Sequence, residues 1–246
     1  MSGAGRVNLE PAWVLHRRPY RDTSEIVDLF TPNHGRVGAV ARGSRRARRR
    51  TPLELFQPLH VSWAGKGELV TLAGAEPRGR GLEATGRRLL SMFYVNELVL
   101  RLTLRQDPHP DIFATYESTV YRLAQDAGEA KTLRLFERDL LDSLGYGLLL
   151  DRDVEGAEVR ADCAYQYRLE EGPRRAEGNA GSALRISGRA LRAIHTGCLD
   201  DATDLREARL LLTAALDHYL GGRPLKTRQF LNALRSRASG SSLLAK

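Results

Sequence analysis

The most concentrated chemistry in the sequence is a run of arginines. Six arginines fall within the nine residues from Arg42 to Arg50. Guanidinium groups make bidentate hydrogen bonds to phosphate and stack on nucleobases. Like charges packed this closely repel one another, so such a segment stays solvated unless an anion neutralises it. The run therefore predicts a phosphate-binding loop, with a plain solvated basic loop as the alternative.

Other residues extend or support this basic region. Arg17, Arg18, Arg21 and Lys66 belong to the same N-terminal part of the chain. Aromatic side chains near basic ones can stack on single-stranded bases, and Tyr20 and Phe56 are the candidates. Packing is the competing interpretation for both. Trp13 and Trp63 alternate with apolar residues, which favours the core of a barrel.

The charge is unevenly distributed along the chain. The net charge is +7 over residues 1–80, −5 over residues 81–220 and +6 over residues 221–246. Basic ends around an acidic middle favour a polyanionic partner, although solubility alone can also explain surface charge. The predicted nucleic-acid-binding residues are Arg17, Arg18, Arg42, Arg45, Arg46, Arg48, Arg49, Arg50, Lys66, Arg223, Lys226 and Arg228.

Short catalytic and metal-binding signatures are missing from the sequence. There is no P-loop, no H-E-x-x-H and no G-x-S-x-G, and the six histidines show no ligand spacing. Cys163 and Cys198 are too few for a four-cysteine zinc site or a disulfide framework. We therefore expect no catalytic residues, no cofactor and no metal, and a protein that is not an enzyme.

The first eighty residues carry the period-2 pattern of β-strands. Five short runs are bounded by glycine, proline and asparagine, with one long connection between the third and fourth runs. This pattern predicts a five-stranded oligonucleotide-binding (OB) barrel, with an SH3-like barrel as the competitor. Closure would remove the exposed strand edges.

After residue 80 the period changes to that of helices. Apolar residues recur every three or four positions over three segments, near 85–105, 113–123 and 133–144. Residues 147–186 are irregular and contain one predicted strand or hairpin around 163–169. Ser187 and Asp204 are predicted N-caps of two later helices. The predicted fold class is α+β, with an OB domain over 1–80 and a helical domain over 81–246 that carries the hairpin.

One helix carries a second candidate site. Arg134 lies beside the apolar stripe of Leu133, Phe136 and Leu140. An apolar groove edged by arginine would accept a peptide with an acidic, hydrophobic end. A solvated arginine on a helix surface is the simpler alternative.

Several stretches together resemble the bacterial recombination mediator and DNA repair protein RecO family. They are AWVLHRRPYRDTSEIVDLFT, GRVGAVARGSRR, FQPLHVSWAG, GELVTLAGAE, YVNELVLRL, LRLFERDLLDSLGY and YLGGRPLKTR, in this order. The match runs from about Ala12 to about Arg228. No single stretch is diagnostic, but the ordered set is specific.

The resemblance implies an OB fold joined to a helical domain and a set of activities. These are binding of single- and double-stranded DNA and annealing of complementary strands. The implied partners are the C-terminal tail of the single-stranded DNA-binding protein, and RecR, with which the protein would help load RecA. The implied location is cytoplasmic and nucleoid-associated. The resemblance also places the tail-binding role on Leu133, Arg134, Phe136 and Leu140.

The sequence departs from some members of that family at one place. Those members carry a four-cysteine zinc module after the third helix, where this chain offers only Cys163. The chain thus resembles the zinc-free members, in which packing must hold the hairpin. An RNA-binding or ribosome-associated OB protein is the alternative function, because the same arginine loop would support it.

Overall fold

The structure is a computed structural model that describes residues 5–44, 53–125, 127–176 and 184–230. The chain forms two compact units, one of residues 1–125 with 227–246 and the other of residues 126–226. The boundary predicted at residue 80 separates the strands of the barrel from the helices. By contacts, however, the first two helices group with the barrel, because the barrel's outer face packs against them.

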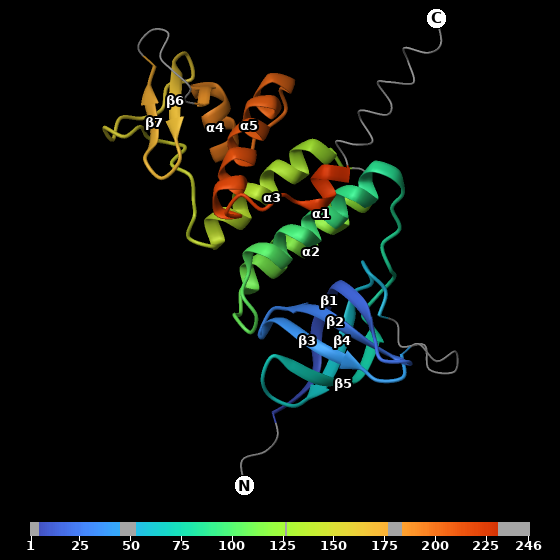
Figure 1. Ribbon diagram of the computed structural model, residues 1–246. Helices are drawn as coiled ribbons and strands as arrows, with labels where there is room; N and C mark the ends of the chain where they lie inside the picture. Colours follow the sequence, from blue (N-terminus) through green and yellow to red (C-terminus); the bar gives the residue numbers. More distant parts are fainter. Residues whose placement is uncertain (1–4, 45–52, 126, 177–183, 231–246) are drawn as a thin grey trace, which may run out of the picture. The chain divides into compact units, whose positions relative to one another are not determined.

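The first unit begins with a closed five-stranded barrel (Figure 1). Neighbouring strands follow the order β1-β2-β3-β5-β4, and β4 pairs back with β1. All pairs are antiparallel except β3 with β5. This arrangement is the predicted OB barrel. The strands are β1 (Arg6–Tyr20), β2 (Ser24–Thr31), β3 (Gly35–Ala41), β4 (Leu59–Ala64) and β5 (Leu69–Pro77).

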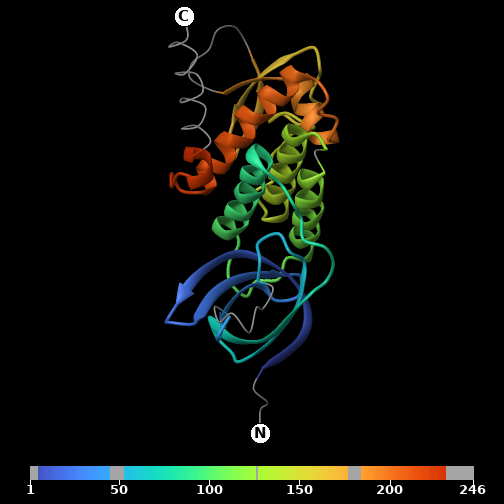
Figure 2. The ribbon, with the colours of Figure 1, turned by 90° about the vertical axis from the view of Figure 1, so that its right-hand side faces the viewer.

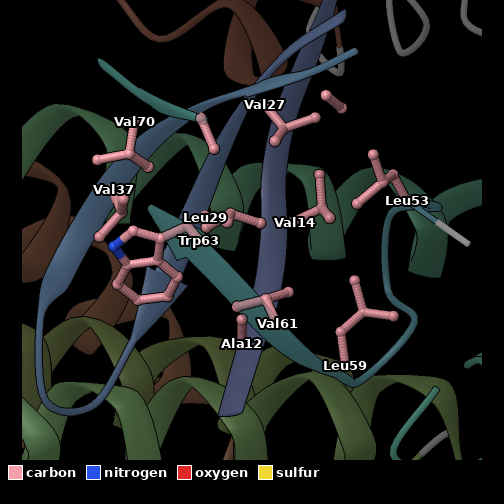
Figure 3. Packing of buried hydrophobic residues seen from close by; sticks show 12 residues of the cluster. Ala12, Val14, Val27, Leu29, Val37, Leu53, Leu59, Val61, Trp63 and Val70 are labelled. Atoms are coloured by element: carbon pink, nitrogen blue, oxygen red, sulfur yellow. The ribbon is translucent and has the colours of Figure 1, made fainter. Parts of the chain in front are cut away.

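Alternate residues of each strand fill the barrel, as period 2 requires. Val14, Val27, Leu29 and Val61 lie at the centre of this core and Trp63 closes one side of it (Figure 3). Leu53, from the connection between β3 and β4, joins the same core. The prediction of Trp63 as barrel core is confirmed by its 4% exposure and its neighbours.

Trp13 is buried on the opposite face of its strand. Its indole ring packs edge-on against Tyr116 and Tyr121, and its Nε1 donates to Glu117 at 3.1 Å. The prediction that Trp13 belongs to the barrel interior was wrong. Its neighbours Ala12 and Val14 take the inward positions, and period 2 turns Trp13 outward toward a helix.

Two helices of the first unit cover this part of the barrel and run side by side (Figures 1 and 2). They are α1 (Gly86–Leu102) and α2 (Pro110–Ala124). Asn96 of α1 donates to the Leu15 carbonyl at 3.0 Å and accepts from the Tyr116 hydroxyl at 2.8 Å. Burial raises the pKa of Tyr116, so this hydroxyl stays a donor. The helices are thus tied to β1 by polar as well as apolar contacts.

The chain returns to the first unit after residue 226. The backbone amide and the hydroxyl of Thr227 both donate to the Glu97 carboxylate of α1, at 2.9 and 2.6 Å. The guanidinium of Arg228 lies 5.9 Å from the centre of the Tyr94 ring. Residues 226–230 are helical, so this carboxylate satisfies an amide at a helix N-terminus.

The second unit packs a small sheet against three helices. Its helices are α3 (Glu129–Ser143), α4 (Gly188–Thr196) and α5 (Ala202–Tyr219), and its strands are β6 (Ala164–Arg168), β7 (Gly172–Arg175) and β8 (Leu184–Ser187). Strand β6 is central and antiparallel to both neighbours. Tyr165, Tyr167 and Ile186 turn inward and pack on Leu191 and Ile194 of α4. Packing therefore holds the hairpin region.

The caps of the two later helices follow the predictions only in part. The Ser187 side chain accepts from the Ala190 amide, so its prediction as an N-cap is confirmed. The prediction for Asp204 was wrong, because Asp201 accepts from the amides of Thr203 and Asp204. Asp204 lies one turn further on and is buried, and the Nε of Arg189 lies 3.0 Å from its carboxylate.

Among the described residues, no helix is long and apolar enough to cross a membrane.

Candidate nucleic-acid interface

The outer face of β1, β2 and β3 carries cross-strand rows of side chains. Residues that pair across neighbouring strands point to the same face. Arg18 pairs with Ile26, and Ile26 pairs with Val40. Tyr20 pairs with Ser24 at the end of the β1–β2 hairpin. Arg42 follows the inward-facing Ala41, so alternation turns it outward beside them.

A hollow of about 570 Å³ lies at this end of the face, lined by Tyr20, Arg21, Thr23, Ser24, Val40, Arg42 and Gly43. Arg21 adopts φ +52°, which L residues rarely occupy, and its guanidinium lies 5.2 Å from the centre of the Tyr20 ring. Arg18, Arg21 and Arg42 are exposed. We call Arg18, Tyr20, Arg21 and Arg42 the open half of the face. It combines cationic groups with one accessible aromatic ring.

The other predicted basic residues near the barrel are placed differently. Arg17 pairs with the inward-facing Val27, and its guanidinium lies 3.0 Å from the Glu54 carboxylate. Lys66 is in the β4–β5 loop and lines a separate hollow. Arg45, Arg46, Arg48, Arg49 and Arg50 lie outside the described residues. The structure therefore brings Arg18 and Arg42 together and does not place Arg17 or Lys66 with them.

A charged row separates the open half from the part covered by helices. His16 pairs with Asp28, and Asp28 with Gly38. Arg105, from the α1–α2 connection, forms an ion pair with Asp28. A Cβ at Gly38 would overlap the Arg105 guanidinium, so glycine leaves the space that this arginine needs. The pair neutralises a carboxylate that would otherwise face incoming phosphates.

Arg36 adds a further charge beside this row. Its Nη2 donates to the Thr103 carbonyl at 2.8 Å. Burial lowers the pKa of Arg36, and the nearby positive charge of Arg105 lowers it further.

Sequence reasoning missed Asp28, Gly38 and Arg105. The sequence did contain one signal for Asp28, since it is an acidic residue at an outward position of a strand in an otherwise basic domain. Such a residue is expected to have a cationic partner.

The second aromatic candidate serves packing. Phe56 is 3% exposed, and its ring centre lies 5.4 Å from that of Phe93 in α1. Stacking on a base needs an accessible ring face, which Tyr20 offers and Phe56 does not. Tyr20 thus remains as the aromatic candidate on the barrel.

The basic residues near the C-terminus belong to different units. Arg228 lies in the first unit, half-buried, with its guanidinium 3.4 Å from the Tyr94 hydroxyl. Arg223 and Lys226 lie in the second unit and are exposed. Arg228 therefore has a structural contact in addition to any role toward DNA.

The predicted peptide groove on α3 is largely buried. Phe136 and Leu140 are each 1% exposed, and Leu133 is half-buried. The Arg134 guanidinium pairs with Glu137, whose side chain is fully buried. A peptide reaching Phe136 or Leu140 would therefore require these side chains or their neighbours to move. Capture of an acidic tail here stays a prediction.

No group of three or more potential ligands is placed to hold a metal within the described ranges. Both cysteines are free thiols, Cys163 half-buried and Cys198 exposed. The described residues of the first unit instead combine an OB barrel with an open, cationic outer face, which is the architecture of oligonucleotide-binding proteins.

Comparison with known proteins gives a more specific assignment. The family models "Recombination protein O N terminal" and "Recombination protein O C terminal" match residues 7–79 and 83–229. The DNA repair protein RecO of Alkalilimnicola ehrlichii is 48% identical over 95% of this chain and 94% of its own length. The DNA repair protein RecO of Nitrosococcus oceani is 45% identical over 94% of this chain and 95% of its own length. The chain belongs to the RecO family of DNA repair proteins.

Proposed function

We propose that the protein binds single- and double-stranded DNA through the open half of the barrel face and anneals complementary strands. The observation that carries this proposal is that Arg21 and Arg42 line one hollow together with Tyr20, while Arg18 is exposed on the same barrel face. The arginine run from Arg45 to Arg50 directly follows this face in sequence. The run therefore adds positive charge to the same N-terminal part of the sequence.

Annealing requires no covalent chemistry. Two strands repel through their phosphates, and a cationic surface that binds those phosphates releases condensed counterions. Arginine binds phosphate through paired N–H groups without reading the base, so the open half accepts any sequence. Tyr20 stacks on a base and thereby favours single strands over duplex. The basic residues Arg223, Lys226 and Arg228 hold the second strand in this proposal.

We infer the protein partners from the family and from the expected chemistry of each contact. They are the acidic tail of the single-stranded DNA-binding protein, RecR and, indirectly, RecA. Together they place the protein as a mediator that helps load RecA onto coated strands. The half-buried Leu133 and the guanidinium of Arg134 are the parts of the α3 stripe where an acidic, hydrophobic tail would bind.

An annealing assay on strands coated with single-stranded DNA-binding protein tests the main proposal. A triple variant with Arg18, Arg21 and Arg42 changed to Gln is compared with Arg80→Gln, whose arginine is 88% exposed and pairs with Glu83 away from this face. We expect the triple variant to anneal at least tenfold more slowly and Arg80→Gln to match the parent. Equal annealing by parent and triple variant would remove the open half from the mechanism. If complementary RNA strands annealed faster than matched DNA strands, the result would favour the RNA-binding alternative.

The tail contact needs its own test, because Arg134 also has a structural role. Losing a partner of a buried charge typically costs about 3–5 kcal/mol, so Arg134→Ala is expected to lower stability by an amount in this range. Leu133→Glu changes a half-buried side chain instead and places a negative charge where the acidic tail would bind. We expect it to weaken binding of a tail peptide, measured by fluorescence anisotropy, while circular dichroism and binding to naked DNA stay near those of the parent. Unchanged peptide affinity in Leu133→Glu would move the tail site elsewhere.

A further inference from the structure

A second hollow lies toward the other end of β3 from the open half. Its volume is about 320 Å³, and it shares no lining residue with the first hollow. Its walls come from the start of β1, the β2–β3 turn, the β4–β5 loop and the α1–α2 connection, all within the first unit. The residues that matter below are His34, Val37, Trp63, Lys66 and Val70.

The wall of this hollow contains a hydrogen-bond donor. Trp63 is 4% exposed, and its indole N–H has no hydrogen-bond partner among the described residues and is not one of their fully buried polar atoms, so it can be reached from outside. Figure 3 shows the indole nitrogen on the Val37 side of the ring, and both Val37 and Val70 line the hollow. A buried indole N–H usually finds an acceptor, as that of Trp13 does at Glu117. The N–H of Trp63 thus suits an acceptor supplied by a ligand.

Two further side chains complete a site of mixed character. The His34 ring stands edge-on to Trp63, with ring centres 5.2 Å apart. Lys66 is exposed, and no ion pair or hydrogen bond engages its ammonium among the described residues. Gly65 and Gly67 adopt φ +116° and +93°, a backbone conformation that residues with side chains disfavour. Because they carry no side chains, these glycines add no bulk to the β4–β5 loop where it lines the hollow. The hollow therefore offers one hydrogen-bond donor, one aromatic ring and one cation.

We propose that this hollow takes a single unstacked nucleobase of a DNA strand. The Trp63 N–H donates to a carbonyl or ring nitrogen of the base, His34 lies against it, and Lys66 neutralises the adjoining phosphate. A volume of about 320 Å³ is at the small end for ligand sites, which range over about 300–1,000 Å³, and so suits one planar base. A base within a duplex is stacked and paired, so this site selects single strands.

This inference rests on the proposed DNA binding and adds a base-binding site to it. Nucleic acid fits the hollow because a base carries acceptors on its edge for the Trp63 N–H, has a phosphate next to it for Lys66, and presents a planar ring that can lie against His34. The β4–β5 loop is also one of the loops with which OB barrels bind oligonucleotides.

Trp63→Phe tests the site because it keeps an aromatic ring and removes only the N–H and part of the indole. The probes are an oligothymidylate and an abasic strand of the same length, which present equal numbers of phosphates. We expect the parent to bind oligothymidylate more than tenfold more tightly than the abasic strand, because the abasic strand loses both the base that stacks on Tyr20 and the base held by Trp63, and the hydrogen bond at Trp63 contributes about tenfold of this preference. Trp63→Phe should reduce this preference several-fold, and the matched control Trp13→Phe should keep it.

A second measurement avoids any change at Trp63. In Trp13→Phe protein the emission of Trp63 is observed alone, because the chain has two tryptophans. We expect oligothymidylate to quench or shift this emission and the abasic strand to leave it unchanged. A preference retained by Trp63→Phe together with unresponsive emission would overturn the base site while leaving the proposed function standing. Failure of the parent to bind either strand would overturn the proposed function itself.

Discussion

The two ends of one barrel face differ in what covers them. Toward the helices, the outward residues Trp13 and Phe30 pack on the aromatic side chains of α2. Toward the β1–β2 turn, the outward residue Arg18 is exposed, and Tyr20 lines a hollow together with Arg42. Both ends obey the same alternation along the same strands. The difference shows that the neighbouring elements, and not the strand pattern, decide which part of a barrel face is available to a ligand.

The row of Asp28 marks where one half changes into the other. Arg105 arrives from the connection between the covering helices and neutralises this carboxylate. The same contact therefore belongs to both halves, since it fixes the α1–α2 connection and keeps the approach to the open half free of negative charge. Substitutions on either side of this row should separate stability from DNA binding.

The largest effect is expected at the covered half. Trp13→Ala removes a fully buried indole and its hydrogen bond to Glu117, so we expect a loss of about 3–5 kcal/mol in the free energy of unfolding. Urea denaturation followed by circular dichroism measures it. DNA affinity per folded molecule should stay within twofold of the parent. A loss below about 1 kcal/mol would contradict the packing of Trp13 between barrel and helix.

An intermediate effect on both properties is expected at the boundary row. Arg105→Ala leaves the Asp28 carboxylate, whose side chain is 12% exposed, without its strongest cationic partner. We expect stability to fall by about 1–3 kcal/mol. Affinity for a single-stranded oligonucleotide should fall as well, because a bare negative charge then faces the phosphates. Asp28→Asn combined with Arg105→Ala removes that charge and should restore the DNA affinity but not the full stability.

If the double variant bound DNA as weakly as Arg105→Ala, the carboxylate would not be the cause. Arg105 would then contact the phosphates directly. This outcome would extend the open half toward the helices and would weaken the contrast between the two halves. Binding and unfolding measured on the same preparations distinguish the two cases.

Sequence patterns predicted the barrel, its five strands and the long third-to-fourth connection, because a half-buried strand imposes period 2 on its own residues. They misplaced Trp13, because the faces of a barrel strand differ only in what packs on them. They also missed the pair of Asp28 and Arg105, which are 77 residues apart and meet only when a helix connection crosses the barrel. The N-cap was assigned to Asp204 rather than Asp201 because three acidic residues compete within five positions.

The sequence predicted which types of residue form the candidate site, but it did not predict which of the arginines lie together on the barrel face. Arg18 and Arg42 were expected to bind phosphate and do lie on one face, whereas charge alone did not distinguish them from Arg17, which turns toward Glu54. Register decides this difference, and the irregularity between Val14 and His16 shifts the register by one residue. Such a bulge leaves no clear trace in the sequence. The burial of Phe56 was not predictable either, because this residue lies in the connection between β3 and β4, where no strand period indicates which side chains are buried.

The smallest effects on stability are expected at the open half, where they test the comparison most directly. Arg18→Gln and Arg42→Gln should each change the free energy of unfolding by less than about 0.5 kcal/mol, as exposed substitutions do. Each should reduce the slope of log affinity against log salt for single-stranded DNA by about 0.7, the value for one lost phosphate contact. Arg80→Gln, exposed but off this face, should leave the slope unchanged. A stability loss without a change of slope would make these arginines structural like Trp13, and the two halves would then differ in composition only.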